Sequence, residues 1–118
     1  MNIFIDGGTR GSRICLVDGD KTIVHVRKTK TGDTPTNNEL EYLALEYALQ
    51  YIKNNHKGKS IKIYSDSKLI VNQMNGDWRV TTDSLIPLYN KCKAKMTDDI
   101  KLRWVSRKFN LAGHVLED

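Results

Sequence analysis

The sequence predicts an α/β protein with a five-stranded mixed sheet flanked by helices, in the order βββαβααβ with a short C-terminal helical stub. Three stretches rich in apolar and β-branched residues open the chain, at 2–6, 13–18 and 22–28. The segment DGD at 18–20 joins the last two, and Asp-Gly favours a tight hairpin turn, so these strands form an antiparallel meander. Two more strands follow, each connected through helices, which is the pattern of a mixed sheet covered by helices.

A long amphipathic helix follows a polar loop at residues 29–36. Pro35 and the Thr-Asn-Asn run at 36–38 mark its start, and we expect it to span 36–55. Its apolar residues recur at three- and four-residue steps, which is helical spacing. They are Leu40, Leu43, Ala44, Tyr47, Ala48 and Tyr51.

Strand-like and helical stretches alternate through the second half of the chain. Pro87 is compatible with the first turn of a helix, because that position has no intrahelical N–H bond to lose. The expected elements are a strand at 61–65, a short helix from just beyond Asp66 to the Asn-Gly at 75–76, a helix at 84–96, a strand at 100–106 and one or two helical turns in the tail 107–118.

The composition is that of an ordinary globular protein, and we expect one domain over residues 1–118. Charged residues make up 28% of the 118 residues and the apolar set 39%. No stretch has the length of a membrane span, and the start shows no signal-peptide pattern, so we expect a cytoplasmic protein with no membrane partner. Cys15 and Cys92 lie far apart, which favours reduced thiols. The net charge of +5 and pI near 9.2 suit a polyanionic partner.

Two of the predicted strands end on an aspartate, Asp6 in FIDGG and Asp66 in YSDSK. Carboxyl ends of helix-linked strands are where sites form in such sheets, so the two carboxylates become neighbours if their strands are adjacent. Each also has a plain structural reading. An aspartate before Gly-Gly is often a turn former, and Asp66 stands where it could cap the next helix.

The segment TNNELE supplies a third carboxylate. Thr36 and Glu39 have capping-box spacing, and so do Asn38 and Glu41, so one of the two glutamates serves the helix start. Glu41 lies at helical steps from the apolar residues at 45 and 48, so its side chain tilts towards the packed face. Glu39 lies on the solvated face. Glu41 is therefore the candidate site residue.

Three converging carboxylates repel one another unless a cation neutralises them. Oxygen ligands without histidine or cysteine pairs favour Mg²⁺ or Mn²⁺ over zinc. Mg²⁺ held by a few carboxylates, with waters and substrate phosphate completing its shell, is a common arrangement for phosphodiester chemistry.

The set FIDGG, TNNELE, YSDSKLIVNQMNG and WVSRKFNLAG, in this order and spacing, resembles type 1 ribonuclease H over essentially the whole chain. It is similar to compact members without a basic insertion, because only GDWRVTTD separates the second and third helices. The resemblance implies a ribonuclease H-like fold and endonucleolytic cleavage of the RNA strand of RNA–DNA hybrids, leaving 5′-phosphate and 3′-hydroxyl ends. It also implies that Asp6, Glu41 and Asp66 hold two Mg²⁺ ions, with Mn²⁺ as a possible substitute.

The resemblance further assigns residues to substrate binding. The paired amides of Asn37 and Asn38 would contact the hybrid in its minor groove, where an amide can recognise base edges and the 2′-hydroxyl. Trp78 would pack on a deoxyribose of the DNA strand, or else cover the core between two helices. The remaining candidates approach backbone or phosphate: Gly7, Gly8, Thr9, Ser67, Lys68 and Arg107.

The family's fourth carboxylate has no counterpart in RKFNLAGH. Alignment on Arg107 and Asn110 puts His114 at its place, whereas alignment on the alanine puts Gly113 there. The nearest carboxylates are those of Glu117 and Asp118. We include His114 among the catalytic candidates, as a metal ligand or a proton carrier to the leaving group; the alternative is a surface histidine in a frayed terminus.

Three functions are thus consistent with the sequence. The first is an active, monomeric ribonuclease H that binds an RNA–DNA hybrid. The second is a non-catalytic module of the same fold that binds hybrid or double-stranded RNA. The third, a DNA nuclease of the same superfold, fits less well because the Thr-Asn-Asn segment points to 2′-hydroxyl recognition. Without a basic insertion, we expect weak and salt-sensitive binding.

Overall fold

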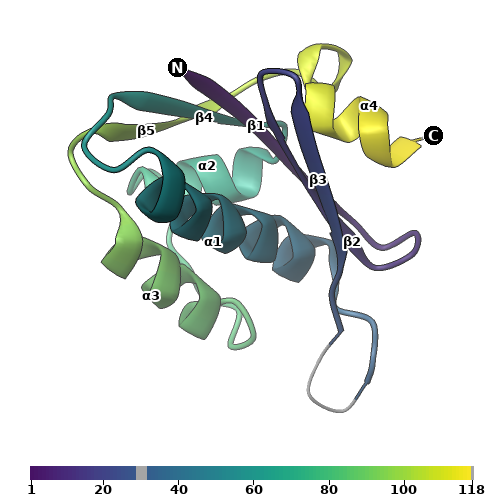
Figure 1. Cartoon of the computed structure of the whole chain (residues 1–118). Coiled ribbons are helices and arrows are strands. Elements are labelled where there is room, and N and C mark those ends of the chain that lie inside the picture. The colour runs from purple at the N-terminus through teal and green to yellow at the C-terminus, as the bar shows by residue number, and fades with distance from the viewer. Residues whose placement is uncertain (29–31, 118) are drawn as a thin grey trace.

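The computed structural model describes residues 1–28 and 32–117, and its sheet confirms the predicted fold class. Five strands lie in the order β3-β2-β1-β4-β5 (Figure 1). β1, β2 and β3 pair antiparallel, and β1, β4 and β5 pair parallel. Their bounds are β1 Asn2–Gly8, β2 Arg13–Asp18, β3 Lys21–Val26, β4 Ile61–Ser65 and β5 Ile100–Trp104.

The helices also follow the predicted order. Of the predicted polar loop at 29–36, residues 29–31 lie outside the described part of the chain. No helix among the described residues is long and apolar enough to span a membrane. The helices are α1 Asn37–Asn55, α2 Lys68–Met74, α3 Ile86–Lys95, the short 3₁₀ helix η1 Arg107–Phe109 and α4 Leu111–Glu117.

The two faces of the sheet carry separate apolar clusters because side chains alternate along each strand. Ile14 and Leu16 of β2 pack in the large cluster with α1. Cys15 and Val17 point the other way and pack against Ala112 and Leu116 of α4. Figure 1 shows the result, with α1, α2 and α3 on one side of the sheet and α4 on the other.

Strand β1 continues past Asp6, which differs from the sequence expectation that this strand ends on the aspartate. Gly7 and Gly8 still pair with Ile14 and Arg13 of β2, so the antiparallel ladder extends the strand by two residues. Asp66, in contrast, follows directly after Ser65, the last residue of β4. The parallel pairing of β1 with β4 confirms that the strands carrying Asp6 and Asp66 are neighbours.

Candidate active site

Three carboxylates converge where the central strands β1 and β4 meet helix α1. Asp6 lies on β1, Asp66 follows β4, and Glu41 lies in the first half of α1. One oxygen of each lies within 4.8 Å of the other two. Asp6 is 2% exposed and Glu41 is 7% exposed, so two of the three are buried. The structure therefore brings together the three acidic residues that the sequence singled out.

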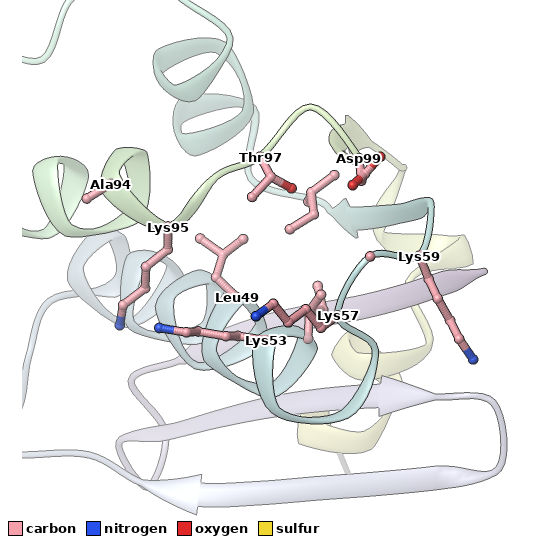
Figure 2. A pocket seen from close by; sticks show the side chains of 11 residues that line it. Leu49, Lys53, Lys57, Lys59, Ala94, Lys95, Thr97 and Asp99 are labelled. Carbon is pink, nitrogen blue, oxygen red and sulfur yellow. The ribbon is translucent and has the colours of Figure 1, made fainter.

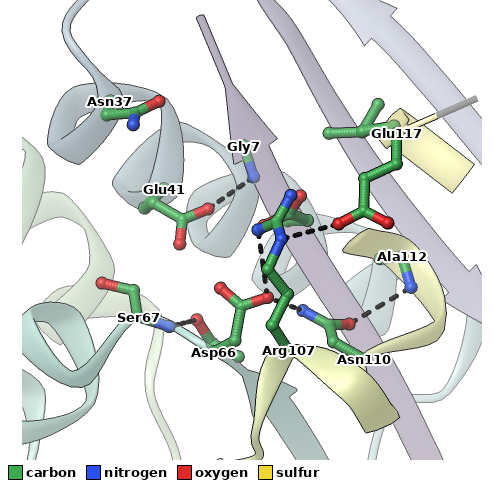
Figure 3. A network of polar contacts seen from close by, with 12 residues as sticks. Gly7, Asn37, Glu41, Asp66, Ser67, Arg107, Asn110, Ala112 and Glu117 are labelled. Atoms are coloured by element: carbon green, nitrogen blue, oxygen red, sulfur yellow. Dashed lines mark hydrogen bonds and ion pairs between the residues drawn. The ribbon is translucent and has the colours of Figure 1, made fainter. Parts of the chain in front are cut away.

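Glycine at position 7 allows α1 to come close enough for this convergence. A Cβ on Gly7 would lie 2.4 Å from the carbonyl carbon and oxygen of Leu40, far inside contact distance. The Gly7 N–H in turn donates a hydrogen bond to the Glu41 carboxylate (Figure 3). The sequence offered Gly7 as a close approach to substrate. The structure shows instead that its missing side chain is needed for helix packing, and the substrate contact stays a prediction.

The first turn of α1 separates the roles of the two glutamates as expected. Thr36 and Glu39 form a capping box, in which the Thr36 hydroxyl accepts from the Glu39 N–H and the Glu39 carboxylate accepts from the Thr36 N–H. Glu41 makes no part of this cap and faces the sheet. The helix start is thus stabilised without the carboxylate that the site requires.

Burial and the neighbouring negative charges raise the pKa of Asp6 and of Glu41. Burial, followed by the negative charge of Asp66, raises the pKa of Asp6 to about 6. Burial and the charges of Asp6 and Asp66 raise the pKa of Glu41 well above its ordinary value. Ionising all three groups together is therefore unfavourable, and a cation among them would relieve both the burial and the repulsion.

Arg107 is the positive side chain nearest to this cluster. Its Nη1 lies 3.5 Å from Asp66 Oδ2 and 4.0 Å from Asp6 Oδ1. Its Nε donates to Glu117 Oε1 at 2.8 Å, and this bond is the main cause of a raised Arg107 pKa. The guanidinium thus bridges the cluster and the last turn of α4 (Figure 3). Because the side chain is 55% exposed, it can also reach substrate.

Asn110 is a site residue that the sequence reasoning missed. It is fully buried. Its Nδ2 donates to Asp66 Oδ2 and to the Ile5 carbonyl oxygen, each at 3.0 Å, while its Oδ1 accepts from the Ala112 N–H at 3.2 Å. One amide therefore fixes the Asp66 carboxylate, the backbone of β1 and the start of α4. The available signal was an asparagine directly before a helical segment, where its side chain can cap the helix.

The segment expected to hold the fourth carboxylate presents a glycine to the site. A Cβ on Gly113 would lie 3.3 Å from Asp66 Oδ2, so α4 packs directly against that carboxylate. His114 is exposed, and the metal-suited group of described residues, formed by Asp6, Glu41 and Asp66, does not include it. Its catalytic role stays a prediction. Glu117 reaches the cluster through Arg107, whereas Asp118 lies outside the described residues.

The predicted minor-groove residues lie together beside the acids. The Thr9 N–H donates to Asn37 Oδ1 at 3.2 Å, which ties the end of β1 to the start of α1. Thr9, Asn37 and Asn38 are all exposed. The structure thus forms one polar, accessible edge from two segments that are distant in sequence.

Ser67 and Lys68 lie on the other side of the cluster, at the start of α2. The Ser67 hydroxyl, not the Asp66 carboxylate, caps this helix by accepting from the Ile70 N–H at 3.3 Å. Asp66 therefore remains available to the site. Lys68 Nζ lies 4.9 Å from the centre of the Trp104 ring, whose Nε1 donates to the Asp66 carbonyl at 3.2 Å. This cation–π contact holds a positive charge near the acids.

Trp78 occupies a separate place between α2 and α3. The residue is 48% exposed and lines a cavity of about 590 Å³ together with Gln73, Arg79 and Tyr89. The lining contains none of the three carboxylates. Trp78 is thus accessible for stacking on a ligand, although its contact with a deoxyribose stays a prediction.

A mixed sheet with this strand order defines a ribonuclease H-like protein when it bears one acidic residue on β1, one directly after β4 and one on helix α1. The chain belongs to the reverse transcriptase-like family, whose model matches residues 6–116. This match extends from the first site carboxylate almost to the end of α4.

Solved structures agree with this membership. RNase H1 from the halophilic archaeon Halobacterium salinarum NRC-1 is 25% identical, with a TM-score of 0.77 over 98% of this chain and 92% of that chain. The N-terminal RNase H domain of a Mycobacterium tuberculosis protein is 26% identical, with a TM-score of 0.74 over the same shares. LC11-RNase H1, solved in complex with an RNA/DNA hybrid, is 23% identical and supports the fold, with a TM-score of 0.75 over 93% of this chain and 88% of that chain.

The donor set fits a hard divalent cation. The three side chains offer only carboxylate oxygens, which Mg²⁺ and Mn²⁺ prefer. The raised pKa values of Asp6 and Glu41 show that the protein's own donors do not fully compensate these charges. Asp6, Glu41 and Asp66 are therefore the residues that would hold such an ion.

Proposed function

We propose that the protein is an endoribonuclease that cleaves the RNA strand of RNA–DNA hybrids by two-metal-ion hydrolysis, leaving 5′-phosphate and 3′-hydroxyl ends. The observation that carries the proposal is the convergence of Asp6, Glu41 and Asp66 within 4.8 Å. Three clustered acids oppose binding of a polyanion unless cations neutralise them, so a simple nucleic-acid binder has no use for them.

Each residue of the site has a defined task in this proposal. Asp6, Glu41 and Asp66 hold Mg²⁺, or Mn²⁺ as a substitute, through their carboxylate oxygens. The bound cations supply water activation and charge compensation at the scissile phosphate. Asn110 keeps the Asp66 carboxylate oriented through its 3.0 Å hydrogen bond. Arg107 turns from the neutralised acids towards a substrate phosphate, which its exposed guanidinium is suited to bind.

Recognition of a hybrid is supported by the polar edge next to the acids. The amides of Asn37 and Asn38 can both donate and accept, so they can recognise base edges and the 2′-hydroxyl that distinguishes RNA from DNA. The bond from Thr9 to Asn37 fixes this edge relative to β1. LC11-RNase H1, which shares the fold, binds an RNA/DNA hybrid in its solved structure.

We further propose that the protein acts as a monomer in the cytoplasm. Both cysteines are free and buried, which suits a reducing compartment. Size-exclusion chromatography with light scattering tests the monomer, and a dimer peak at micromolar concentration would contradict it.

The test is cleavage of a labelled RNA–DNA hybrid, with Mg²⁺ and then Mn²⁺, by the wild type, Asp66→Asn and His114→Ala. We expect the wild type to cut only the RNA strand and Asp66→Asn to lose this activity. A large loss in His114→Ala would assign the histidine a catalytic role in place of the missing carboxylate. Duplex DNA and duplex RNA serve as control substrates.

The alternative function is a non-catalytic module that binds hybrid or double-stranded RNA. Its support is the glycine at 113, together with a metal-suited group that contains three carboxylates among the described residues. Hybrid binding without cleavage in either metal would favour the module over the enzyme. We also expect hybrid affinity to fall strongly between low and moderate salt, because phosphate contacts dominate affinity. A salt-independent affinity would contradict that expectation.

A further inference from the structure

A second cavity lies at the opposite end of the parallel strands from the carboxylates. It borders residues 57–59 just before β4, whereas Asp66 follows the end of that strand. Its volume is about 290 Å³. Helix α1, helix α3 and the start of β5 surround it (Figure 2). Its apolar lining consists of Leu49, Ile52, Ala94 and Ile100.

Lysine side chains form the rim of this apolar cavity. Lys53 of α1, Lys57 of the following turn and Lys95 of α3 extend along one side of it, whereas Lys59 extends away (Figure 2). The lining carries four lysines and one acid, Asp99, so its formal net charge is +3. Among ion pairs between described residues, Lys95 pairs with Glu46 at 3.9 Å and none includes Lys53, Lys57 or Lys59.

Stabilisation of helix C-termini explains the positions of only some of these lysines. Lys53 and Lys95 lie in the last turns of α1 and α3, where a positive charge stabilises the helix dipole. Lys57 follows the C-cap His56 and lies outside the last turn of α1. The cavity thus combines an apolar lining with lysine ammonium groups that form no ion pair between described residues. This combination suits a ligand that is both apolar and negatively charged.

We propose that this cavity binds an acidic peptide segment of a partner protein, with one bulky apolar side chain in the hollow and neighbouring carboxylates on the lysines. The volume supports a single anchoring side chain, since it lies just below the usual range of about 300–1,000 Å³ for whole small-molecule sites. The excess positive charge is complementary to a run of aspartate and glutamate, and such complementarity favours encounter and selects the partner.

A nucleic-acid backbone fits the cavity less well. Phosphates would contact the lysines but would leave the apolar floor without a partner. The cavity also lies away from the carboxylates, at the other end of β4, so a peptide bound there leaves the active site open. The partner would thus recruit the protein to its substrate without blocking it. This inference does not depend on the proposed nuclease activity.

The test is fluorescence anisotropy with a short labelled peptide that carries one phenylalanine between aspartates and glutamates. Lys53→Glu/Lys57→Glu should weaken binding by at least about tenfold, because two attractive charges become repulsive. Ala94→Phe, which fills the cavity from an exposed helix position, should weaken it without changing the charge. Lys28→Glu/Lys91→Glu carries the same charge change on exposed lysines outside the cavity and should bind normally.

A peptide with alanine in place of phenylalanine completes the design. Loss of binding with this peptide, together with the pattern above, supports the site. Equal binding by both peptides, or equal weakening in both lysine double variants, would reduce the interaction to general charge attraction and overturn the proposal. Full displacement of the peptide by an RNA–DNA hybrid would overturn it too. Melting temperatures confirm that each variant is folded.

Discussion

The carboxylate of Asp18, which is partly buried, and the buried carboxylates of Asp6 and Glu41 have opposite surroundings. Asp18, at the end of β2, accepts a hydrogen bond from the Tyr51 hydroxyl at 2.7 Å and contacts His56 Nε2 at 2.8 Å. Burial acts to raise the pKa of Asp18, but the bonds from Tyr51 and His56 outweigh it and lower the pKa. Asp6 and Glu41 instead face each other and Asp66, and their pKa values rise.

The difference shows which carboxylate charge is stabilised by contacts within the protein itself. The Asp18 carboxylate contacts the Tyr51 hydroxyl on α1 and the His56 ring at the end of that helix, so its charge is stabilised within the fold. Asp6 and Glu41 are short of donors, and their ionised forms destabilise the metal-free protein. Asp18 thus has a structural role, whereas the cluster of Asp6, Glu41 and Asp66 requires a cation from solution to stabilise its charges. Substitutions in each cluster should have opposite effects on stability and activity.

The largest expected effect comes from removing the charge of Asp6. Asp6→Asn should reduce Mg²⁺-dependent hybrid cleavage by at least about 10³-fold, because the loss of one ligand removes several kcal/mol of transition-state stabilisation. In EDTA at pH 8, the same variant should be more stable than the wild type by on the order of 1–3 kcal/mol, because burial and Asp66 penalise the ionised carboxylate. Chemical denaturation and a cleavage assay measure the two effects.

Asp18→Asn is the control for this substitution, since it removes one partly buried negative charge elsewhere on the sheet. It should retain cleavage and show no stabilisation in EDTA. If Asp6→Asn were less stable than the wild type without metal, the contrast between the two clusters would be wrong.

The second largest effect is expected at Gly7, which allows α1 to pack closely against β1. Gly7→Ala should destabilise the protein by about 3 kcal/mol and lower cleavage, because the new methyl group would force α1 away from β1. Gly8→Ala is its control: a Cβ there would lie 3.9 Å from Leu116 Cδ1, an ordinary contact. Urea denaturation of both variants checks this, and similar losses in the two would argue against a special packing role for Gly7.

A smaller effect is expected at Asp18, and it depends on pH. Asp18→Asn should cost about 1.5–2 kcal/mol at neutral pH, the lower part of the range for hydrogen bonds to a charged group. Because the pKa of Asp18 is lowered from 3.8, its stabilisation is complete above that value and is lost as the pH falls through the folded-state pKa. The wild type should therefore approach the variant's stability in acid. A constant difference down to the lowest pH at which both remain folded would contradict this explanation.

The smallest effect is expected from Arg107. This half-exposed guanidinium competes with cations for Asp6 and Asp66, so Arg107→Ala should strengthen Mn²⁺ binding about two- to fivefold, in keeping with the small energies of exposed ion pairs. Isothermal titration calorimetry measures the affinity, with Arg103→Ala on β5 as the control. Weaker Mn²⁺ binding in Arg107→Ala would show that the arginine supports the metal site.

Much of the fold was predictable because it rests on local patterns. The Asp18-Gly19 turn fixes the hairpin of β2 and β3, and helical spacing from Leu40 onwards fixes α1. The choice of Glu41 over Glu39 was also predictable, since helix geometry separates a capping residue from one on the buried face. These features depend only on neighbours in sequence.

Other site features depend on contacts between distant segments, which spacing cannot reveal. The role of Gly7 requires knowing that Leu40 lies against it. Asn110 appeared only as a residue of a motif, because its bonds to Ile5 and Asp66 join separate elements. The same holds for Arg107, whose ion pairs with the acids follow from where η1 is placed beside β1 and β4.

The bonds that build the site also have a consequence for folding kinetics. The contacts from Gly7 to Glu41, from Asn110 to Asp66 and from Asn110 to Ile5 span 34, 44 and 105 residues of the chain. Such high contact order slows folding, because long loops must close before these contacts form. A partly folded intermediate in which either end of the chain is unfolded cannot form all of these contacts. Recovery of cleavage after dilution from denaturant should therefore lag behind recovery of helical circular dichroism, and report the last step of folding.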